Sequence, residues 1–260
     1  MNEQTIRVLN QLNRKFYDGQ AKSWQASRQY YWPSWEKFTS FSSLEFTSQL
    51  KVADVGCGTG RFAKFICGKY PLAEYHGFDL SPSLLELAQK SVTTRSQTND
   101  ANPIDPRRIK FISLDIVEAL LNNKALLSEK YDLIVVFGVL HHLPSKILRR
   151  RFLTQLAEHL LPKGEIWLTT WQPAKLDQKT PKQLQKSEIL ATLGLKNDDL
   201  EPGDSFVGWK DTKAIRYVHW LDKSEEQELK KLPHLKLAQG WLETSAGERG
   251  NQCWLFSRTS

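Results

Sequence analysis

The sequence predicts an α/β fold, a doubly wound and mostly parallel seven-stranded sheet with helices on both faces, preceded by an N-terminal helical cap. From residue 50 onward, short apolar runs alternate with stretches of helical periodicity, which is typical of parallel strands joined by right-handed crossovers. The run Asp132–Phe137 is almost entirely apolar, as expected for a strand covered on both faces. We expect residues 1–48 to form the cap and residues 49–260 the α/β domain, with an insertion at about 173–211.

Each expected strand is a short apolar run bounded by turn residues. The expected strands are residues 50–55, 75–79, 109–114, 132–137, 165–171, 215–220 and 253–256. The expected helices have apolar residues three or four positions apart. They are residues 60–70, 82–90, 145–161, one around 181–193, and 224–231. Ser81 is placed to cap the second helix because Pro82 follows it, Pro162-Lys163-Gly164 should end the third, and residues 93–107 should form a loop.

The composition excludes several classes of protein. The 260 residues include three cysteines without a Cys-x-x-Cys pair, so we expect no disulfide framework and no bound metal. No run approaches the roughly 18 apolar residues of a membrane-spanning helix, and the N-terminus lacks a signal-peptide pattern, so we expect a cytoplasmic protein. The net charge of +7 favours a polyanionic partner, because Lys and Arg gain affinity by releasing phosphate counterions.

The clearest functional signal is a glycine-rich turn between the first strand and the first helix. It reads Asp54-Val55-Gly56-Cys57-Gly58-Thr59-Gly60. Glycine allows a ligand to approach the main chain closely, and the helix that follows points free N–H groups at that ligand. A dinucleotide fingerprint is excluded, because the third glycine of its G-x-G-x-x-G pattern, counted from Gly56, falls on Arg61. The turn therefore indicates S-adenosylmethionine.

Three acidic residues follow three successive strands. Asp54 closes the first strand, Asp79 the second, and Asp115 the third. In doubly wound folds the strands end at one crevice, where a carboxylate after the second strand accepts hydrogen bonds from a ribose diol. Asp115 is placed to accept from an adenine amino group. Each acid alone could be a helix cap, but three at one edge favour a cofactor site.

Four segments resemble the core motifs of class I S-adenosylmethionine-dependent methyltransferases. The segments are residues 54–60, 77–81, 113–116 and 139–143, and the resemblance covers about residues 50–172. It implies S-adenosyl-L-methionine as cofactor, with the glycine turn at the methionine portion, Asp79 at the ribose, and Asp115 near the adenine. The cofactor-binding residues that it implies are Asp54, Gly56, Cys57, Gly58, Gly60, Asp79, Leu80, Asp115, Ile116 and Phe137.

Segments nearer the two ends resemble the tRNA wobble-uridine carboxymethyl methyltransferases, which esterify a 5-carboxymethyl group on an anticodon base. These segments are residues 13–35, 204–210, 216–219 and 250–254. Gly208 and Val218 depart from the family pattern, where proline and an aromatic residue are expected. The resemblance implies tRNA as a partner, together with a small zinc-containing activator protein.

The chemistry of the acceptor points to candidate catalytic residues. A carboxylate is ionised at neutral pH and needs no base, but it needs a cation such as Arg216 or Lys210 to fix it. A phenol or amine would need a general base, which His141, His142 or His219 could provide. The expected catalytic residues are Arg216 and His142, and the expected substrate-binding residues are Arg28, Trp209, Lys210, Arg216 and Tyr217.

Structural roles remain open for these residues. The paired histidines could cap a helix, Arg216 could be a salt-bridge partner, and Arg149-Arg150-Arg151 is expected at the surface. Eight aromatic residues of the cap are expected over the crevice or packed on the sheet, namely Phe16, Tyr17, Trp24, Tyr30, Tyr31, Trp32, Trp35 and Phe38. The alternative functions are a small-molecule O- or N-methyltransferase and a non-catalytic cofactor-binding partner of another enzyme.

Overall fold

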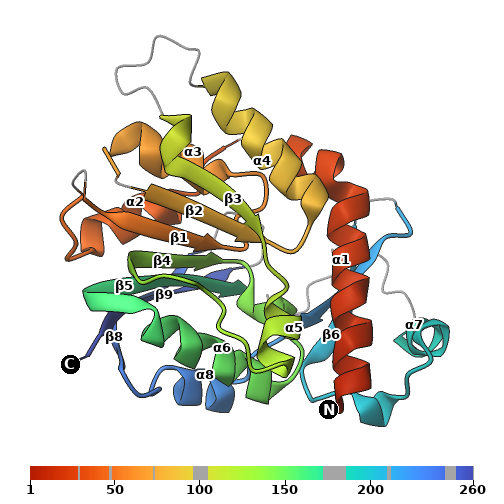
Figure 1. Ribbon diagram of the computed structural model, residues 1–260. Helices are drawn as coiled ribbons and strands as arrows, with labels where there is room; N and C mark the ends of the chain where they lie inside the picture. Colours follow the sequence, from red (N-terminus) through yellow and green to blue (C-terminus); the bar gives the residue numbers. More distant parts are fainter. Residues whose placement is uncertain are drawn as a thin grey trace.

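The computed structural model describes residues 1–28, 30–46, 49–72, 74–95, 105–171, 186–209, 212–243 and 250–259 (Figure 1). Its central sheet has seven strands in the order β3-β2-β1-β4-β5-β9-β8. They are β1 Lys51–Val55, β2 Glu74–Asp79, β3 Ile109–Ser113, β4 Tyr131–Phe137, β5 Leu160–Trp171, β8 Leu235–Glu243 and β9 Asn251–Arg258. The first five pair in parallel, and β9 is antiparallel to both neighbours. The predicted doubly wound, mostly parallel seven-stranded sheet is therefore confirmed.

Helices cover both faces of this sheet (Figure 1). They are α1 Glu3–Ala26, α2 Pro33–Phe41, α3 Arg61–Lys69, α4 Pro82–Arg95, α5 Ile116–Leu121, α6 Lys146–Glu158, α7 Lys186–Leu193 and α8 Lys223–Leu229. One core cluster joins the sheet to α2, α3 and α4, and a second joins its other face to α5, α6 and α8. Alternate residues of β4 serve the two clusters, Leu133 and Val135 on one side and Ile134 and Val136 on the other. Both faces are buried, which explains the apolar sequence of β4.

The strand predicted at 215–220 is not part of the central sheet. It is β7, Ile215–His219, and it pairs antiparallel with β6, Asp204–Gly208, as a separate two-stranded sheet. The seventh strand of the central sheet is instead β8, which sequence analysis did not predict. Most of β8 is half-buried or exposed at the sheet edge, so its sequence lacks the apolar run by which the other strands are recognised.

Several element boundaries also differ from the prediction. The helix expected to continue to residue 161 ends at Glu158, and β5 begins at Leu160, so Pro162-Lys163-Gly164 lies within the strand. Helix α5 was not predicted, because its six residues are too few to show helical periodicity. Helix α4 extends to Arg95, into the expected loop, and residues 96–104 lie outside the described residues. Of the helix expected around 181–193, the part 181–185 also lies outside them, and α7 forms the rest.

A buried ionic network fixes the β6–β7 hairpin to the main body. Arg149 of α6, expected at the surface, is fully buried and donates to Glu225 at 2.6 Å and to Glu201 at 3.0 Å. His219 of β7 lies between Asp204 at 2.7 Å and Glu225 at 2.9 Å. Burial lowers the pKa of His219, but the hydrogen bonds to these two carboxylates outweigh it and raise the pKa above its usual value. The network sets the position of the β7 residues that reach the site described below.

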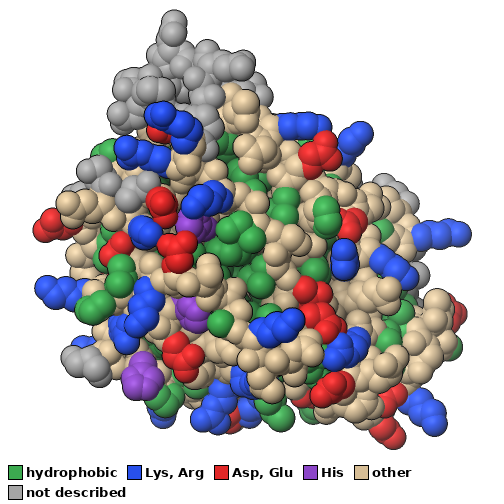
Figure 2. Space-filling view, viewed as in Figure 1, with side chains coloured by type: hydrophobic (Ala, Val, Ile, Leu, Met, Phe, Trp, Pro, Cys, Tyr) green, Lys and Arg blue, Asp and Glu red, His purple; other side chains and the backbone are tan. Residues whose placement is uncertain are grey.

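The surface carries charges of both signs. On the face shown in Figure 2, basic and acidic side chains are interspersed, so the positive net charge is not gathered there into a single basic area. Within the described part of the chain, no helix combines the length and the apolar character that crossing a membrane requires.

Candidate cofactor and acceptor site

A cavity opens at the carboxyl ends of β1, β2 and β4, and helix α1 forms part of its wall. It encloses about 1250 Å³ of non-atom space, open solvent at its mouth included. Eight of the predicted cofactor-binding residues line it, namely Asp54, Gly56, Cys57, Gly58, Asp79, Leu80, Ile116 and Phe137. The predicted residues Gly60 and Asp115 are not part of its lining. The structure therefore gathers most of the sequence motifs around one cavity.

The glycine-rich turn forms the floor of the cavity. Gly56 and Gly58 have φ values of +83° and +55°, a left-handed conformation that favours glycine. The turn is tied to β2, because Gly56 N and Cys57 N donate to Phe78 O at 2.7 and 2.9 Å. A Cβ atom on Gly56 would lie 2.1 Å from Val139 Cγ2. Glycine at these positions therefore leaves main-chain atoms exposed to the cavity, where a residue with a side chain would cover them. This exposure fits the cofactor that the sequence motifs indicate.

Two carboxylates lie beside this turn. Asp79 accepts from Ser81 N and from Gly58 N, both at 2.9 Å, so the second strand and the turn hold its position. Burial raises its pKa to about 6. Asp54 accepts from the Tyr75 hydroxyl, and burial raises its pKa to about 7. Both side chains line the cavity, as a carboxylate that binds ribose hydroxyls or an ammonium group must.

Asp115 has partners within the protein. It caps α5 by accepting from Glu118 N at 3.0 Å, and Asn10 Nδ2 donates to both of its carboxylate oxygens at 3.0 and 3.1 Å. Asn10 lines the cavity, together with Leu114 and Ile116 on either side of Asp115. The role of Asp115 toward adenine remains a prediction. Next to Asp115, it is the hydrogen-bonded Asn10 that lines the cavity.

Sequence analysis did not single out two asparagines of α1. Asn10, Asn13, Tyr17 and Trp24 all line the cavity. Their spacing of three, four and seven residues puts them on one face of the helix. The recurrence of polar and aromatic residues at helical spacing is the sequence signal that could have identified this face. Helix α1 thus covers the carboxyl ends of the strands and adds polar groups to the site.

A hydrogen-bonded chain crosses the cavity wall opposite the glycine turn. His142 Nδ1 lies 3.0 Å from Tyr217 O, and Tyr17 Oη lies 2.7 Å from His142 Nε2. Because a carbonyl oxygen only accepts, Nδ1 carries the proton and Nε2 accepts from the Tyr17 hydroxyl. Burial, with the nearby Arg216, lowers the pKa of His142 to about 3. His142 is therefore suited to orient Tyr17 and is a poor general base at neutral pH.

Arg216 lies behind this wall in a cage of aromatic rings. Its guanidinium carbon is 4.9 Å from the ring centroid of Phe16, 5.0 Å from Trp24, 4.7 Å from Trp171 and 5.7 Å from Trp209. The residue is 4% exposed, and its Nε and Nη1 have no hydrogen-bond partner among the described residues. Trp24 and Trp171 also line the cavity, whereas Arg216 is not among its lining residues, so two of the rings that surround the guanidinium belong to the cavity wall.

The other predicted substrate residues lie in three different settings. Arg28 lines the cavity, and its guanidinium carbon is 3.2 Å from the Trp24 ring centroid. Trp209 Nε1 donates to Ser23 Oγ at 3.0 Å. The Tyr217 side chain is fully buried, its hydroxyl donates to Asp204 at 2.6 Å, and its carbonyl oxygen accepts from His142 Nδ1. Lys210 lies outside the described residues.

Part of the chain is similar to known methyltransferases. Residues 53–166 match a family model described as a methyltransferase domain. A malonyl-[acyl-carrier protein] O-methyltransferase of Acetivibrio thermocellus is 35% identical over 92 residues, which are 35% of this chain and 26% of that protein. A probable tRNA methyltransferase 9B of Homo sapiens is 26% identical over 175 residues, 67% of this chain and 30% of that protein. The matches to curated relatives thus cover from about a quarter to two thirds of their length.

Among solved structures, the fold is similar to that of a magnesium protoporphyrin IX methyltransferase from Synechocystis PCC 6803 with bound S-adenosylhomocysteine. The TM-score is 0.53 at 16% sequence identity, with 96% of this chain and 86% of that chain covered. The family match, the shared fold and the exposed backbone of the glycine turn agree. Residues 53–166 thus match a methyltransferase domain, and the fold is that of a solved methyltransferase.

Proposed function

We propose that this protein transfers the methyl group of S-adenosylmethionine to a carboxylate, and that the carboxylate is the carboxymethyl group of a tRNA wobble uridine. The observation that supports a carboxylate acceptor is Arg216, whose Nε and Nη1 are buried without a partner among the described residues. Leaving buried polar groups unpaired costs about 1–3 kcal/mol each. A carboxylate would accept from either of these groups together with the neighbouring Nη2, in one of the two fork geometries that arginine offers.

The state of the histidine supports the same acceptor. With its pKa lowered to about 3, His142 has little capacity to remove a proton from a phenol or an ammonium group at neutral pH. A carboxylic acid ordinarily loses its proton at a pH of about 4, so the acceptor is already ionised at neutral pH and needs no base. The site thus has the cation that a carboxylate requires and lacks a strong base at His142.

The chain's own residues would do three things in the reaction. The cofactor supplies an activated sulfonium methyl group. The backbone of residues 56–58 and the Asp79 carboxylate would hold the cofactor, while Arg216 would orient the acceptor oxygen toward the methyl group. The hydrogen bond between Tyr17 and His142 would hold this part of the cavity wall in place, and the surrounding aromatic rings would exclude water from the acceptor. Such alignment can lower a barrier by roughly 7–11 kcal/mol.

The choice of tRNA rests on the similarity to tRNA methyltransferase 9B, on the resemblance of residues 13–35, and on the net charge of +7. A second candidate is favoured by the malonyl-[acyl-carrier protein] O-methyltransferases among the relatives. A malonyl group attached through one carboxyl keeps a second, free carboxylate, so it meets the same requirement at Arg216.

One assay separates these acceptors. The protein is incubated with methyl-labelled cofactor and, in parallel, with tRNA that carries 5-carboxymethyluridine, with a malonyl thioester of a carrier protein, and with a metabolite extract. Because the resemblance implies a small zinc-containing activator protein, each reaction is repeated in cell extract. We expect label in tRNA that mild base releases, since an ester is base-labile. Label in the malonyl thioester alone would contradict the tRNA assignment, and base-stable label would contradict a carboxylate acceptor.

A further inference from the structure

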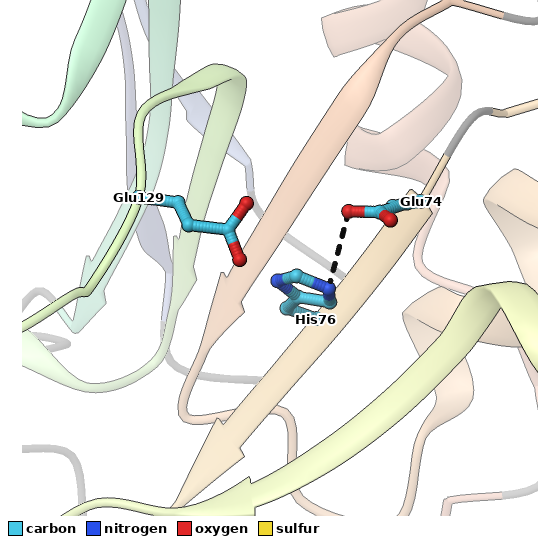
Figure 3. Close-up of side chains that lie close together, drawn as sticks. All are labelled: Glu74, His76 and Glu129. Atoms are coloured by element: carbon cyan, nitrogen blue, oxygen red, sulfur yellow. Dashed lines mark ion pairs between the residues drawn. The ribbon is translucent and has the colours of Figure 1, made fainter.

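A second group of side chains lies at the end of the sheet away from the cofactor cavity. Glu74 begins β2, His76 is its third residue, and Glu129 precedes β4 by two positions. Figure 3 shows the three side chains directed toward one another from these two elements. One ligand atom from each residue lies within 4.8 Å of the others. The cavity is at the carboxyl ends of the same strands, so the two sites are separate.

The imidazole of His76 leaves one nitrogen without a hydrogen bond. His76 is 2% exposed, and its Nδ1 is 2.8 Å from the Tyr131 hydroxyl. Its Nε2 has no hydrogen-bond partner among the described residues, although it lies 3.5 Å from Glu74 Oε2. A buried polar atom of this kind usually has a partner.

The other cluster of similar composition provides a contrast. It consists of Glu201, Asp204 and His219, whose ligand atoms are also close together. There both imidazole nitrogens have carboxylate partners, at 2.7 and 2.9 Å, and the buried Arg149 neutralises the charge. That cluster is complete by itself, whereas the His76 cluster has an imidazole nitrogen available for a ligand.

We propose that Glu74, His76 and Glu129 bind a divalent transition-metal ion, and that Zn²⁺ fits them best. One imidazole nitrogen with two carboxylate oxygens is a donor set for Zn²⁺, whereas Mg²⁺ and Ca²⁺ prefer oxygen alone. With bonds of about 2.1 Å, ligand atoms of a tetrahedral site lie about 3.4 Å apart. The His76 and Glu74 atoms already have this spacing at 3.5 Å, and the Glu129 side chain is 41% exposed, so it can move toward them when its ion pair with Lys51 opens. Water would complete the coordination.

Lys51 competes with a metal ion for the same carboxylates. Its Nζ lies 3.1 Å from Glu74 and 3.0 Å from Glu129. The side chain is 35% exposed, so the ammonium group can move into solvent when an ion enters. The competition predicts that Lys51 limits the affinity for the metal.

The test measures Zn²⁺ binding by calorimetry on tag-free, reduced protein, with Co²⁺ absorption spectra to report nitrogen and oxygen ligation. We expect Glu129→Gln to weaken Zn²⁺ binding at least about tenfold, because a neutral amide is a poor ligand. Lys51→Met should strengthen it by about tenfold, because the competing cation is lost. Zn²⁺ should also raise the melting temperature of the unaltered protein, since it binds only the folded site. Glu86→Gln is the matched control, an exposed glutamate paired with Lys90 on α4, and should bind Zn²⁺ unchanged.

Four results would overturn the proposal. They are the absence of Zn²⁺ binding, equal affinity for Mg²⁺ and Zn²⁺, unchanged affinity in Glu129→Gln, and weaker binding in Lys51→Met. Glu129 and Lys51 are partly exposed, so their substitution should leave the fold intact, and circular dichroism checks this. All of these readouts are independent of methyl transfer, so failure here and failure of the proposed function are distinguishable.

Discussion

Replacing Arg216 by methionine is expected to lower kcat/KM for the carboxylate acceptor by roughly 10²–10³-fold, the loss typical of removing one preorganised charge-stabilising group. Methionine keeps an apolar side chain among Phe16, Trp24 and Trp171 and removes the guanidinium that they surround. Cofactor affinity should change little, because the residues expected to hold the cofactor are those of the glycine turn and Asp79, which line the cavity, and not Arg216. Methyl transfer is measured as base-labile label, and cofactor binding by calorimetry.

Two further variants separate the possible causes of that loss. Arg216→Lys retains the charge but not the two-pronged geometry, so it should recover only part of the activity. Tyr17→Phe removes the hydroxyl that donates to His142 and should reduce activity less than Arg216→Met. Activity of folded Arg216→Met within threefold or so of the unaltered protein would contradict a role for this guanidinium.

Replacing Asp79 by alanine should weaken the binding of S-adenosylhomocysteine by roughly tenfold to a hundredfold. Hydrogen bonds to a charged group contribute about 1.5–3 kcal/mol, and Asp79 is placed to accept them from the ribose. The substitution also leaves Gly58 N and Ser81 N without their acceptor, so a small loss of stability is expected. Calorimetry gives the affinity, and thermal unfolding the stability. Asp79→Asn keeps one acceptor oxygen, so its affinity should lie between that of the alanine variant and that of the unaltered protein. Unchanged affinity in the alanine variant would remove the ribose assignment.

Cofactor affinity is also expected to depend on pH. The pKa of Asp79 is about 6 and that of Asp54 about 7, each raised by burial. The ionised carboxylates accept the hydrogen bonds of the ribose more strongly than the protonated acids do, and only they attract the cofactor's ammonium group through their charge. Cofactor affinity should therefore rise as pH rises through these values and fall below them. Calorimetry from about pH 5 to about pH 8 tests this, because binding releases protons within that range. Asp79→Asn should lack the component near pH 6, and an unaltered profile in that variant would contradict the assignment.

The fold was predictable because its signals are local. The apolar run of β4 and the left-handed glycines at 56 and 58 each follow from a few neighbouring residues. Where local signals were weak, the prediction was wrong. The edge strand β8 is mostly half-buried or exposed, and β7 has the composition of a central strand although, within the described residues, its pairing partner is β6 alone. Pairing partners depend on packing between distant segments, which a single window of sequence does not contain.

The residues of the candidate site also fall into those that local sequence signals predict and those that only the folded structure brings together. By itself the sequence determined the parallel sheet, the cofactor turn and the acidic residue that ends β2, because strand periodicity and glycine conformation act over short distances. Only the tertiary structure decided that rings from residues 16, 24, 171 and 209 enclose Arg216, that Arg149 is buried, and that Glu129 meets His76. These groups are far apart along the chain, and their burial, their pKa values and their unpaired atoms arise only once the chain has folded around them.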